Sequence, residues 1–373
     1  MKILELTNYS AGICGVWTRA REEAIRLAEK GHEVAVFSSN FVKGSDETAE
    51  ERERIGNVII KRFPARKLGG ESFIRWDFED EALNFKPDVI IAHSYRHIHT
   101  TKALKVAEKL RKDGINCKVF LVTHAPFERG STRGLFANIA VYFYDNFIGR
   151  NTIKKFDKVI AITKWEMPYL KRLGLNEDKI EYIPNGIPEE FFRLKELTDE
   201  KNKILFIGRI SPLKSVETVI SAMPLLKNKK ITFEIVGPAE ENYLEELKEL
   251  ISNLGISNRV LFPGAIFDLK EKIKKIDSAK IFVLPSKSEG MPQSLVEAMA
   301  RGKVVVASDT PAARDLIEDG KNGFLFRIGD EKELAGVINK FDRKMQKSRK
   351  EAKKSVEKFA WGKIIERIEK LLI

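Results

Sequence analysis

Cysteine is scarce in this chain of 373 residues, which contains only Cys14 and Cys117. Two cysteines cannot form a framework of disulfides, and no cluster of cysteine and histidine has the spacing of a zinc site. No apolar stretch is long enough to span a bilayer. The first residues are typical of a β-strand and lack the layout of a signal peptide, so we expect a cytoplasmic protein. These absences disfavour a disulfide-rich secreted domain, a zinc-binding module and an integral membrane protein.

Glutamine is also rare, whereas charge is abundant. Charged residues make up 32% of the chain and glutamine occurs twice, which favours a thermophilic source, although the 17 asparagines point the other way. The formal net charge is +12, and residues 91–179 alone hold 17 basic and 8 acidic side chains. This surplus is either an ordinary solvated surface or an attraction for a lipid surface, a phosphorylated acceptor or nucleic acid.

The length exceeds that at which a single hydrophobic core usually stops growing, so two domains are expected. Residues 182–188 contain two prolines and an Asn-Gly pair, which is typical of a linker, and residues 44–54 are predicted to form an exposed loop or short helix. Apolar strands alternate with helical stretches on both sides of the linker, and this predicts two doubly wound parallel-sheet domains that face each other. The predicted strands are residues 3–6, 33–37, 88–92, 118–122 and 158–162, then 204–207, 232–236, 260–262, 281–284 and 304–307.

Two carboxylates in the second half, Glu289 and Glu297, flank a predicted turn between a strand and a helix. Residues 281–284 have the pattern of a buried strand, and Pro292 suits the first position of the following helix. Glu289 is then expected at the carboxyl end of the strand, and Glu297 within the helix. Open α/β sheets bind ligands at this edge, where free N–H groups at a helix start can donate to an anion or to sugar hydroxyls.

Two cations, Arg209 and Lys214, lie in the turn that begins at Gly208 and follows the first strand of the second half. They are five positions apart, so both charged groups can converge on one anion such as a diphosphate. Two ordinary surface cations would give the same pattern. Their place at the carboxyl end of a strand favours the binding role.

The corresponding turn in the first half contains Gly12 and Gly15, which allow close approach of a ligand but are a weak signal alone. His93 and His124 each follow a predicted strand, and their spacing does not resemble a metal site. A lone histidine is usually structural, but two at successive strand ends indicate polar contact with a substrate. Residues 163–166 form a capping box and predict the start of a helix.

The aromatic-rich segment at residues 136–148, FANIAVYFYDNFI, lies inside the basic stretch. The simpler interpretation is a helix buried in the core. The alternative is an interfacial helix that dips into a membrane beside anionic head groups.

Together these residues resemble the retaining glycosyltransferases of the two-Rossmann-domain GT-B fold, family 4, also described as glycosyl transferases group 1. The resemblance covers nearly the whole chain. It rests on the early glycine turn and on the segments PDVIIAHS, VTHAP, IAITKWE, IPNGI, GRISPLKS, SEGMPQSLVEAMARGKVVVASD, LIEDGKNGFLF and FAWGKIIERI. The long block around Glu289 and Glu297 is the most specific of them.

The resemblance implies a role for each matching residue. Residues 1–185 would bind the acceptor, residues 186–357 would bind the nucleotide sugar, and a helix at 358–373 would cross back to the first domain. On the acceptor side it implies His93, His124 and Arg129, with His124 also lining the sugar pocket near the reacting carbon. The implied donor-binding residues are Gly15, Gly208, Arg209 and Lys214 at the diphosphate, Gly264 at the nucleobase, Glu297 at the ribose, and Glu289, Gly290 and Met291 at the transferred sugar.

The chain departs from the family pattern at Cys14, Pro188 and residues 310–314. The last departure concerns the donor pocket and leaves the base and the sugar unassigned. We expect transfer of a sugar from a UDP-, GDP- or ADP-sugar to an acceptor hydroxyl with retained configuration, catalysed by Arg209, Lys214, Glu289 and His124. No metal and no cofactor are expected. The acceptor is a glycan, a glycolipid or a small molecule, with a lipid-linked or phosphorylated acceptor and peripheral contact with an anionic membrane as one option. The alternatives are a sugar-nucleotide epimerase of the same fold, which the two glutamates disfavour, and a basic nucleic-acid-binding protein, for which no recognisable module is present.

Overall fold

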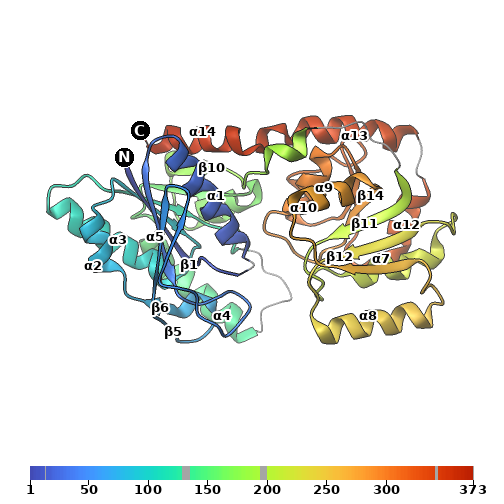
Figure 1. The fold of residues 1–373 in the computed structure, drawn as a ribbon, viewed down its shortest axis with the longest axis horizontal. Helices are drawn as coiled ribbons and strands as arrows, with labels where there is room; N and C mark the ends of the chain where they lie inside the picture. The colour runs from blue at the N-terminus through green and yellow to red at the C-terminus, as the bar shows by residue number, and fades with distance from the viewer. Residues whose placement is uncertain (13, 128–134, 194–199, 341–342, 373) are drawn as a thin grey trace. The chain divides into compact units, whose positions relative to one another are not determined.

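The computed structural model describes residues 1–12, 14–127, 135–193, 200–340 and 343–372 (Figure 1). The chain forms two compact units. The first comprises Met1–Asn185 together with Lys363–Ile373, and the second comprises Gly186–Gly362. None of the helices in the described part of the chain combines the length and the apolar character that crossing a membrane requires.

The first unit is built on an eight-stranded sheet with the strand order β10-β9-β8-β7-β1-β2-β4-β3. All neighbouring strands are parallel except β3, which runs antiparallel to β4 at the edge. Its strands are β1 (Lys2–Tyr9), β2 (Glu33–Ser39), β3 (Arg52–Ile55), β4 (Val58–Phe63), β7 (Val89–His93), β8 (Lys118–Val122), β9 (Lys158–Ala161) and β10 (Ile180–Tyr182), and β5 (Ala65–Lys67) pairs with β6 (Ile74–Trp76) in a separate small sheet.

Helices pack on this sheet through narrow apolar faces. In α1 the buried side chains include Trp17, Ala24 and Leu27, spaced three to seven positions apart as one face of a helix requires. The C-terminal helix buries Ile364, Ile365, Ile368 and Leu372, and its Glu369 forms an ion pair of 2.7 Å with Lys30 at the end of α1. The helical segments of this unit are α1 (Gly15–Glu29), η1 (Glu71–Phe73), α2 (Glu79–Phe85), α3 (Ile98–Lys112), α4 (Leu135–Phe143), the π-helical η2 (Tyr144–Gly149), α5 (Arg150–Ile153), η3 (Lys164–Glu166), α6 (Met167–Arg172), η4 (Glu177–Lys179) and most of α14 (Trp361–Leu372).

The second unit has a six-stranded parallel sheet in the order β13-β12-β11-β14-β15-β16. Helices α7 and α8 lie on one face of it and α9, α10 and α13 on the other (Figure 1). The strands are β11 (Lys201–Ile207), β12 (Thr232–Val236), β13 (Val260–Gly264), β14 (Ala279–Leu284), β15 (Val304–Ser308) and β16 (Phe324–Phe326). The helical segments are η5 (Glu189–Phe192), α7 (Val216–Ala222), η6 (Met223–Leu225), α8 (Glu241–Asn253), α9 (Leu269–Asp277), α10 (Gln293–Ala300), α11 (Pro311–Arg314), α12 (Glu331–Asn339), α13 (Arg343–Val356) and η7 (Glu357–Phe359).

Two Rossmann-like units with parallel sheets confirm the predicted fold class, and each strand predicted from an apolar run is present. The prediction of an irregular segment at residues 44–54 was wrong at its end, because β3 begins at Arg52. This strand has the sequence RERI and is mostly exposed, so it carries no apolar pattern. Charged side chains on an edge strand are a common protection against pairing with another chain. Pro292 is the N-cap residue of α10 and not its first helical residue.

Candidate active site

In the second unit, three glycines bring the carboxyl ends of neighbouring strands close together. Gly208, Gly237 and Gly264 follow or end β11, β12 and β13. The Gly208 N–H donates to the carbonyl of Val236 at 3.0 Å, and the Gly237 N–H donates to that of Gly264 at 3.0 Å. A Cβ on Gly237 would lie 1.9 Å from the carbonyl oxygen of Gly208, and the residue has a φ of +148°. Only glycine fits this position, and it allows the loop at Gly208 to lie against the end of β12.

The loop after β11 contacts the loop after β14. The backbone N–H of Lys287 donates to the carbonyl of Leu213 at 2.9 Å. The Nζ of Lys214 lies 2.6 Å from Oε1 of Glu289, and the Ser286 hydroxyl donates to the same oxygen at 2.6 Å. The structure therefore brings Lys214 and Glu289 together as an ion pair that is largely shielded from solvent, with the two side chains 22% and 9% exposed.

Arg209 lies on the same strand-end loop, with an exposed side chain. Among the residues that the structure describes, it forms no ion pair. Gly290 and Met291 continue the loop from Glu289 into α10. Arg209, which is not paired with any of the described carboxylates, and Lys214, which Glu289 holds in place, can therefore bind one anion from two sides.

Glu297 of α10 is paired with a lysine that the sequence did not reveal. Its side chain is almost fully buried, and the Nζ of Lys272 lies 2.7 Å from Oε1 and 2.6 Å from Oε2. Lys272 belongs to α9, whose sequence LKEKIKKID has several lysines with nothing to distinguish one from another. Glu289 and Glu297 thus each have their own cation. The oxygens of a carboxylate that is paired with a cation accept hydrogen bonds, which suits hydroxyl groups.

In the first unit, the two predicted histidines are in direct contact. His93 ends β7, His124 follows the neighbouring strand β8, and Nδ1 of His93 lies 2.8 Å from Nε2 of His124. The other ring nitrogen of His93 lies 2.7 Å from Oε2 of Glu5, in the middle of β1. Glu5 was missed by the sequence reasoning. The sequence feature that could have revealed it is a single carboxylate inside the apolar run KILEL, and the structure shows this position to be fully buried.

The backbone at His124 is held in an unusual conformation by a buried carboxylate. His124 and Ala125 have φ values of +58° and +54°, in the left-handed region that side chains rarely adopt. Glu166 accepts hydrogen bonds from the Ala125 N–H at 2.8 Å and from the Thr123 hydroxyl. Glu166 also accepts from the Ile162 N–H at 2.9 Å, and from the N–H and hydroxyl of Thr163, both at 3.0 Å, which confirms the predicted capping box. One carboxylate therefore ties the end of β8 to the end of β9 and fixes the direction of His124.

Four histidines of this unit lie in surroundings that favour the neutral form. Burial lowers the pKa of His99 and of His124 to about 3 and that of His97 to about 4, and it holds the pKa of His93 well below its usual range. Burial also raises the pKa of the Glu5 carboxyl well above its usual range, with a further increase from the nearby charge of Glu23. Burial, which disfavours the charged form of each group, is the common cause.

Glu5, Glu23 and His93 place one oxygen or nitrogen atom each within 4.8 Å of one another. These are the atom types that bind metals. However, Arg19 already supplies a positive charge to this cluster, because its Nε donates to Glu23 at 2.7 Å and its charge acts on Glu5. The group therefore does not fit a divalent cation, which would be repelled by the guanidinium.

Gly15 is the first residue of α1, and a Cβ built there would meet nothing within 4 Å, so the helix start is open to close approach. Gly12, with a φ of +81°, is instead required by packing, because a Cβ there would lie 2.4 Å from the carbonyl oxygen of Lys43. Arg129, which was expected on the acceptor side, lies outside the described residues.

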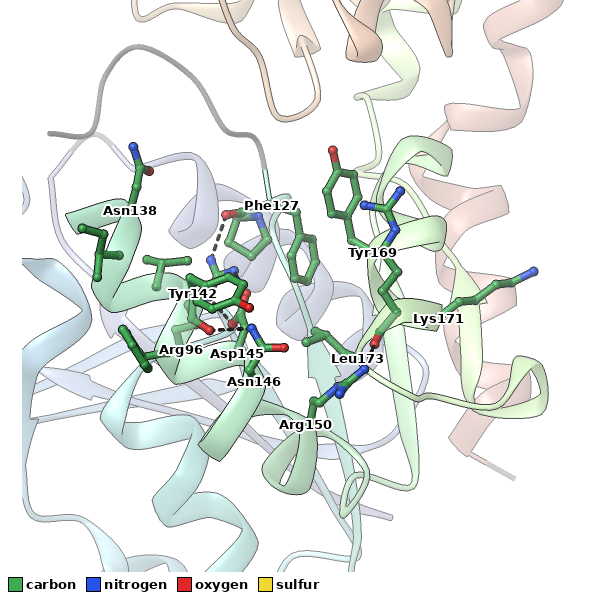
Figure 2. Close-up of a pocket in the computed structure, with 15 residues that line it drawn as sticks. Arg96, Phe127, Asn138, Tyr142, Asp145, Asn146, Arg150, Tyr169, Lys171 and Leu173 are labelled. Atoms are coloured by element: carbon green, nitrogen blue, oxygen red, sulfur yellow. Dashed lines mark hydrogen bonds and ion pairs between the residues drawn. The ribbon is translucent and has the colours of Figure 1, made fainter. Parts of the chain in front are cut away.

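The aromatic-rich segment lines a groove on the surface of the first unit, with a volume of about 960 Å³ (Figure 2). The prediction of a core helix was wrong here, because α4 and η2 leave large apolar side chains in solvent. Figure 2 shows residues of this helix on one side of the groove and Phe127, Tyr169 and Leu173 on the other. The large apolar side chains that are exposed in this segment are Ile139 (44%), Tyr142 (56%), Phe143 (54%), Phe147 (68%) and Ile148 (55%).

Comparisons with known proteins agree with this architecture. Residues 13–191 match the family model described as Glycosyltransferase Family 4, and residues 188–359 match the model described as Glycosyl transferases group 1. The chain is 31% identical to the uncharacterized glycosyltransferase MJ1607 of Methanocaldococcus jannaschii, across 80% of this chain and 77% of the relative. The crystal structure of HepE from Anabaena in complex with UDP superposes with a TM-score of 0.76, at 21% identity and over 100% of this chain and 99% of that chain. The chain belongs to the GT-B glycosyltransferases.

This glycosyltransferase is also 28% identical to the phosphatidyl-myo-inositol mannosyltransferase of Mycolicibacterium smegmatis, across 91% of this chain and 84% of the relative. Since the chain belongs to an enzyme family, the polar side chains at the strand ends of both units are candidates for binding its substrates. The second unit of the glycosyltransferase holds the pairs Lys214–Glu289 and Lys272–Glu297, and the first unit holds the buried contact of His124 with His93.

Proposed function

We propose that this glycosyltransferase moves a sugar from a nucleotide diphosphate donor to an acceptor hydroxyl, with retained configuration and without a metal. The observation that carries the proposal is the contact of 2.6 Å between Lys214 and Glu289 at the carboxyl end of the second sheet. One loop there supplies cations for a diphosphate, and the other supplies a carboxylate for sugar hydroxyls. The UDP complex of HepE, a protein with the same fold, supports a nucleotide-linked donor.

In this proposal Arg209 and Lys214 stabilise the negative charge that develops on the departing diphosphate. Preorganised charges of this kind are usually the largest single contribution to catalysis. They also offer a way to bind a diphosphate without a metal ion. Lys214 is already oriented by Glu289, so little reorganisation is needed when the donor binds.

Glu289 and Glu297 have positioning roles in this proposal. Lys214 and Ser286 both contact Oε1 of Glu289, so we assign its Oε2 to hydroxyls of the transferred sugar. A carboxylate bonded to a lysine and a hydroxyl is a weak nucleophile, which favours positioning over covalent catalysis. Glu297, paired with Lys272, would accept hydrogen bonds from the ribose hydroxyls, and Gly264, Gly290 and Met291 would complete the donor site.

A thermal-shift screen of UDP, GDP, ADP and their sugars tests the donor assignment. A ligand at 100 times its Kd stabilises the folded state by about 2.7 kcal/mol. For a unit of this size, such a gain corresponds to an increase in Tm of about 5–10 °C. We expect one nucleotide, alone and as its sugar, to give this increase. A flat response to every nucleotide tested, at millimolar concentration, would contradict the proposed donor.

For the acceptor, we propose a lipid-linked molecule reached from an anionic membrane surface, with the first unit as the acceptor-binding unit. The groove beside α4 has exposed aromatic side chains, and basic residues lie next to them: Arg150, Lys171 and Arg172. Apolar side chains that insert between lipids and cations that attract their head groups are the two components of interfacial binding. The relative from Mycolicibacterium smegmatis, named for a phosphatidylinositol substrate, supports this acceptor class.

We expect Phe147→Ser to weaken binding to vesicles of anionic phosphatidylglycerol by about 10-fold or more, because a buried phenylalanine contributes about 1.5–3 kcal/mol. Co-sedimentation with such vesicles, and with neutral phosphatidylcholine vesicles for comparison, measures the effect. Phe267→Ser is the matched control, since Phe267 is similarly exposed, at 76%, but belongs to the second unit. Equal sedimentation of the wild type with both vesicle types, or equal losses in both variants, would refute the membrane contact.

A further inference from the structure

A buried chain of side chains lies behind His124. Its ring contacts His93 at 2.8 Å, and the second ring nitrogen of His93 contacts Glu5 at 2.7 Å. The side chains of His93 and Glu5 are completely buried, whereas His124 is partly exposed. Among the residues that the structure describes, Nδ1 of His124 has no hydrogen-bond partner. The chain thus runs from the interior of the sheet to a ring nitrogen that a ligand can reach.

The positions of the protons along this chain depend on one another. A neutral imidazole has one nitrogen that donates and one that accepts. If Glu5 is ionised, His93 donates to it from Nε2, so His93 accepts at Nδ1 and His124 donates from Nε2. If Glu5 is protonated, every bond is reversed, and the proton of His124 lies on Nδ1. The state of Glu5 therefore decides what His124 presents to a ligand.

The surroundings of Glu5 favour the protonated carboxyl. Within the described part of the chain, its Oε1 is buried and has no hydrogen-bond partner, and Oε1 of Glu23 is in the same situation. The charged groups that face Glu5 are Glu23 and Arg19, both of α1, and the guanidinium of Arg19 is already bonded to Glu23 at 2.7 Å. A second ionised carboxylate would leave an uncompensated buried charge, which is costly. A protonated Glu5 avoids this charge and donates its O–H to His93.

We propose that Glu5, through His93, is a positioning residue that fixes His124 as the tautomer with its proton on Nδ1. His124 then presents a donor to the ligand, suited to an oxygen of the acceptor that the first unit binds in our proposal. It has no free electron pair at that nitrogen, so it does not remove the proton from the acceptor hydroxyl. The contact of His124 with the acceptor rests on the proposed function, whereas the tautomer does not.

Long-range proton–nitrogen NMR spectra of the full chain, with labelled histidine, report the tautomer directly. The chain has only five histidines, so single substitutions can assign their signals. We expect the proton on Nδ1 in both His93 and His124, and His99 with its proton on Nε2, because that nitrogen donates to the carbonyl of His93 at 2.8 Å. Protons on Nε2 of both His93 and His124 would overturn the proposal.

Two substitutions at Glu5 separate this role from a merely structural one. Glu5→Gln keeps a group that can donate to His93, so the His124 tautomer should persist. Glu5→Met has a similar volume but no donor, so His124 should become a mixture of tautomers. His99→Gln is the control, a change of a buried histidine in the same cluster whose ring does not contact His124, and it should leave the His124 tautomer unchanged. An unaltered His124 signal in Glu5→Met would refute the chain; if Glu5→Met does not fold, the wild-type and Glu5→Gln spectra decide.

Kinetics provide the second readout. We expect Glu5→Met to lower kcat by about 10-fold, less than the roughly 10²–10³-fold loss for a donor removed outright, with the KM of the donor sugar unchanged within about twofold. Glu5→Gln should recover most of kcat. The NMR measurement needs no donor and no activity, so an incorrect substrate class would leave the tautomer result intact. The NMR result therefore tests the tautomer alone, whereas the kinetic result also tests the proposed function.

Discussion

We expect Lys214→Ala to lower kcat by about 10²–10³-fold, the cost of removing one preorganised charge that stabilises the transition state. Lys214 is the cation that Glu289 holds at 2.6 Å, and in our proposal it neutralises the departing diphosphate. The free energy of unfolding should change far less than the activation barrier, since Lys214 is partly exposed and Glu289 keeps its hydrogen bond from Ser286 when the lysine is lost. Release of the nucleotide diphosphate, measured at saturating donor, together with urea unfolding, separates the two effects.

Lys275→Ala is the matched control for this experiment. Lys275 forms an ion pair of 3.2 Å with Glu234 in the same unit, and its side chain is 24% exposed, compared with 22% for Lys214. Its loss should change kcat by less than about threefold. Wild-type turnover in Lys214→Ala would eliminate the diphosphate role, and equal losses in both variants would indicate a general effect on the second unit.

The second large effect is on stability. Glu166→Ala should destabilise the first unit by at least about 3 kcal/mol, because a buried donor left without an acceptor costs about 1–3 kcal/mol and this carboxylate serves several of them. The N–H groups of Ala125, Ile162 and Thr163 all lose the carboxylate that accepts from them. Hydrogen exchange at these amides measures the loss locally, which avoids assuming that a chain of two units unfolds in one step.

Glu177→Ala tests the specificity of that result. Glu177 lies in the same region, but it is 79% exposed and pairs with Lys171 on the surface, so its loss should have an effect near zero. Glu166→Gln should have an intermediate effect, since an amide oxygen still accepts but its N–H₂ group cannot. If Glu166→Ala is as stable as Glu177→Ala, the left-handed backbone at His124 does not depend on this carboxylate.

The parts of the fold that could be predicted from the sequence are those set by local pattern. Apolar runs such as residues 281–284 and 304–307 allow little except buried strands, and the capping box at Thr163 is a local interaction. The strand β4, VIIKRF, was not predicted, because Lys61 and Arg62 interrupt its apolar pattern. Arg62 is nevertheless buried, and its guanidinium bonds to Ser10 and Glu53. The burial of such a charge depends on partners that are distant in the sequence.

In the candidate site, too, the residues set by local pattern could be predicted and those that depend on distant partners could not. Lys214 and Glu289 were predicted because each follows an identifiable strand, and strand ends of one sheet meet at one edge. The partners Lys272 and Glu5 were not predicted. A lysine among several on one helix, or a carboxylate inside a strand, acquires a role only when another element places a matching group beside it. The exposure of Phe147 could not be predicted either, because an apolar helix is equally compatible with a core and with a surface.

The division of the chain between the two units has a consequence for its synthesis. The first unit begins at Met1 but includes Lys363–Ile373, and the last helix contributes the buried Ile364, Ile368 and Leu372. Domains generally fold in order as the ribosome releases them. Here the first unit cannot be completed until residues 363–373 have been synthesised, and by then the second unit, Gly186–Gly362, is already whole. The nascent first unit must therefore leave the apolar surface that receives this helix uncovered while the second unit is synthesised.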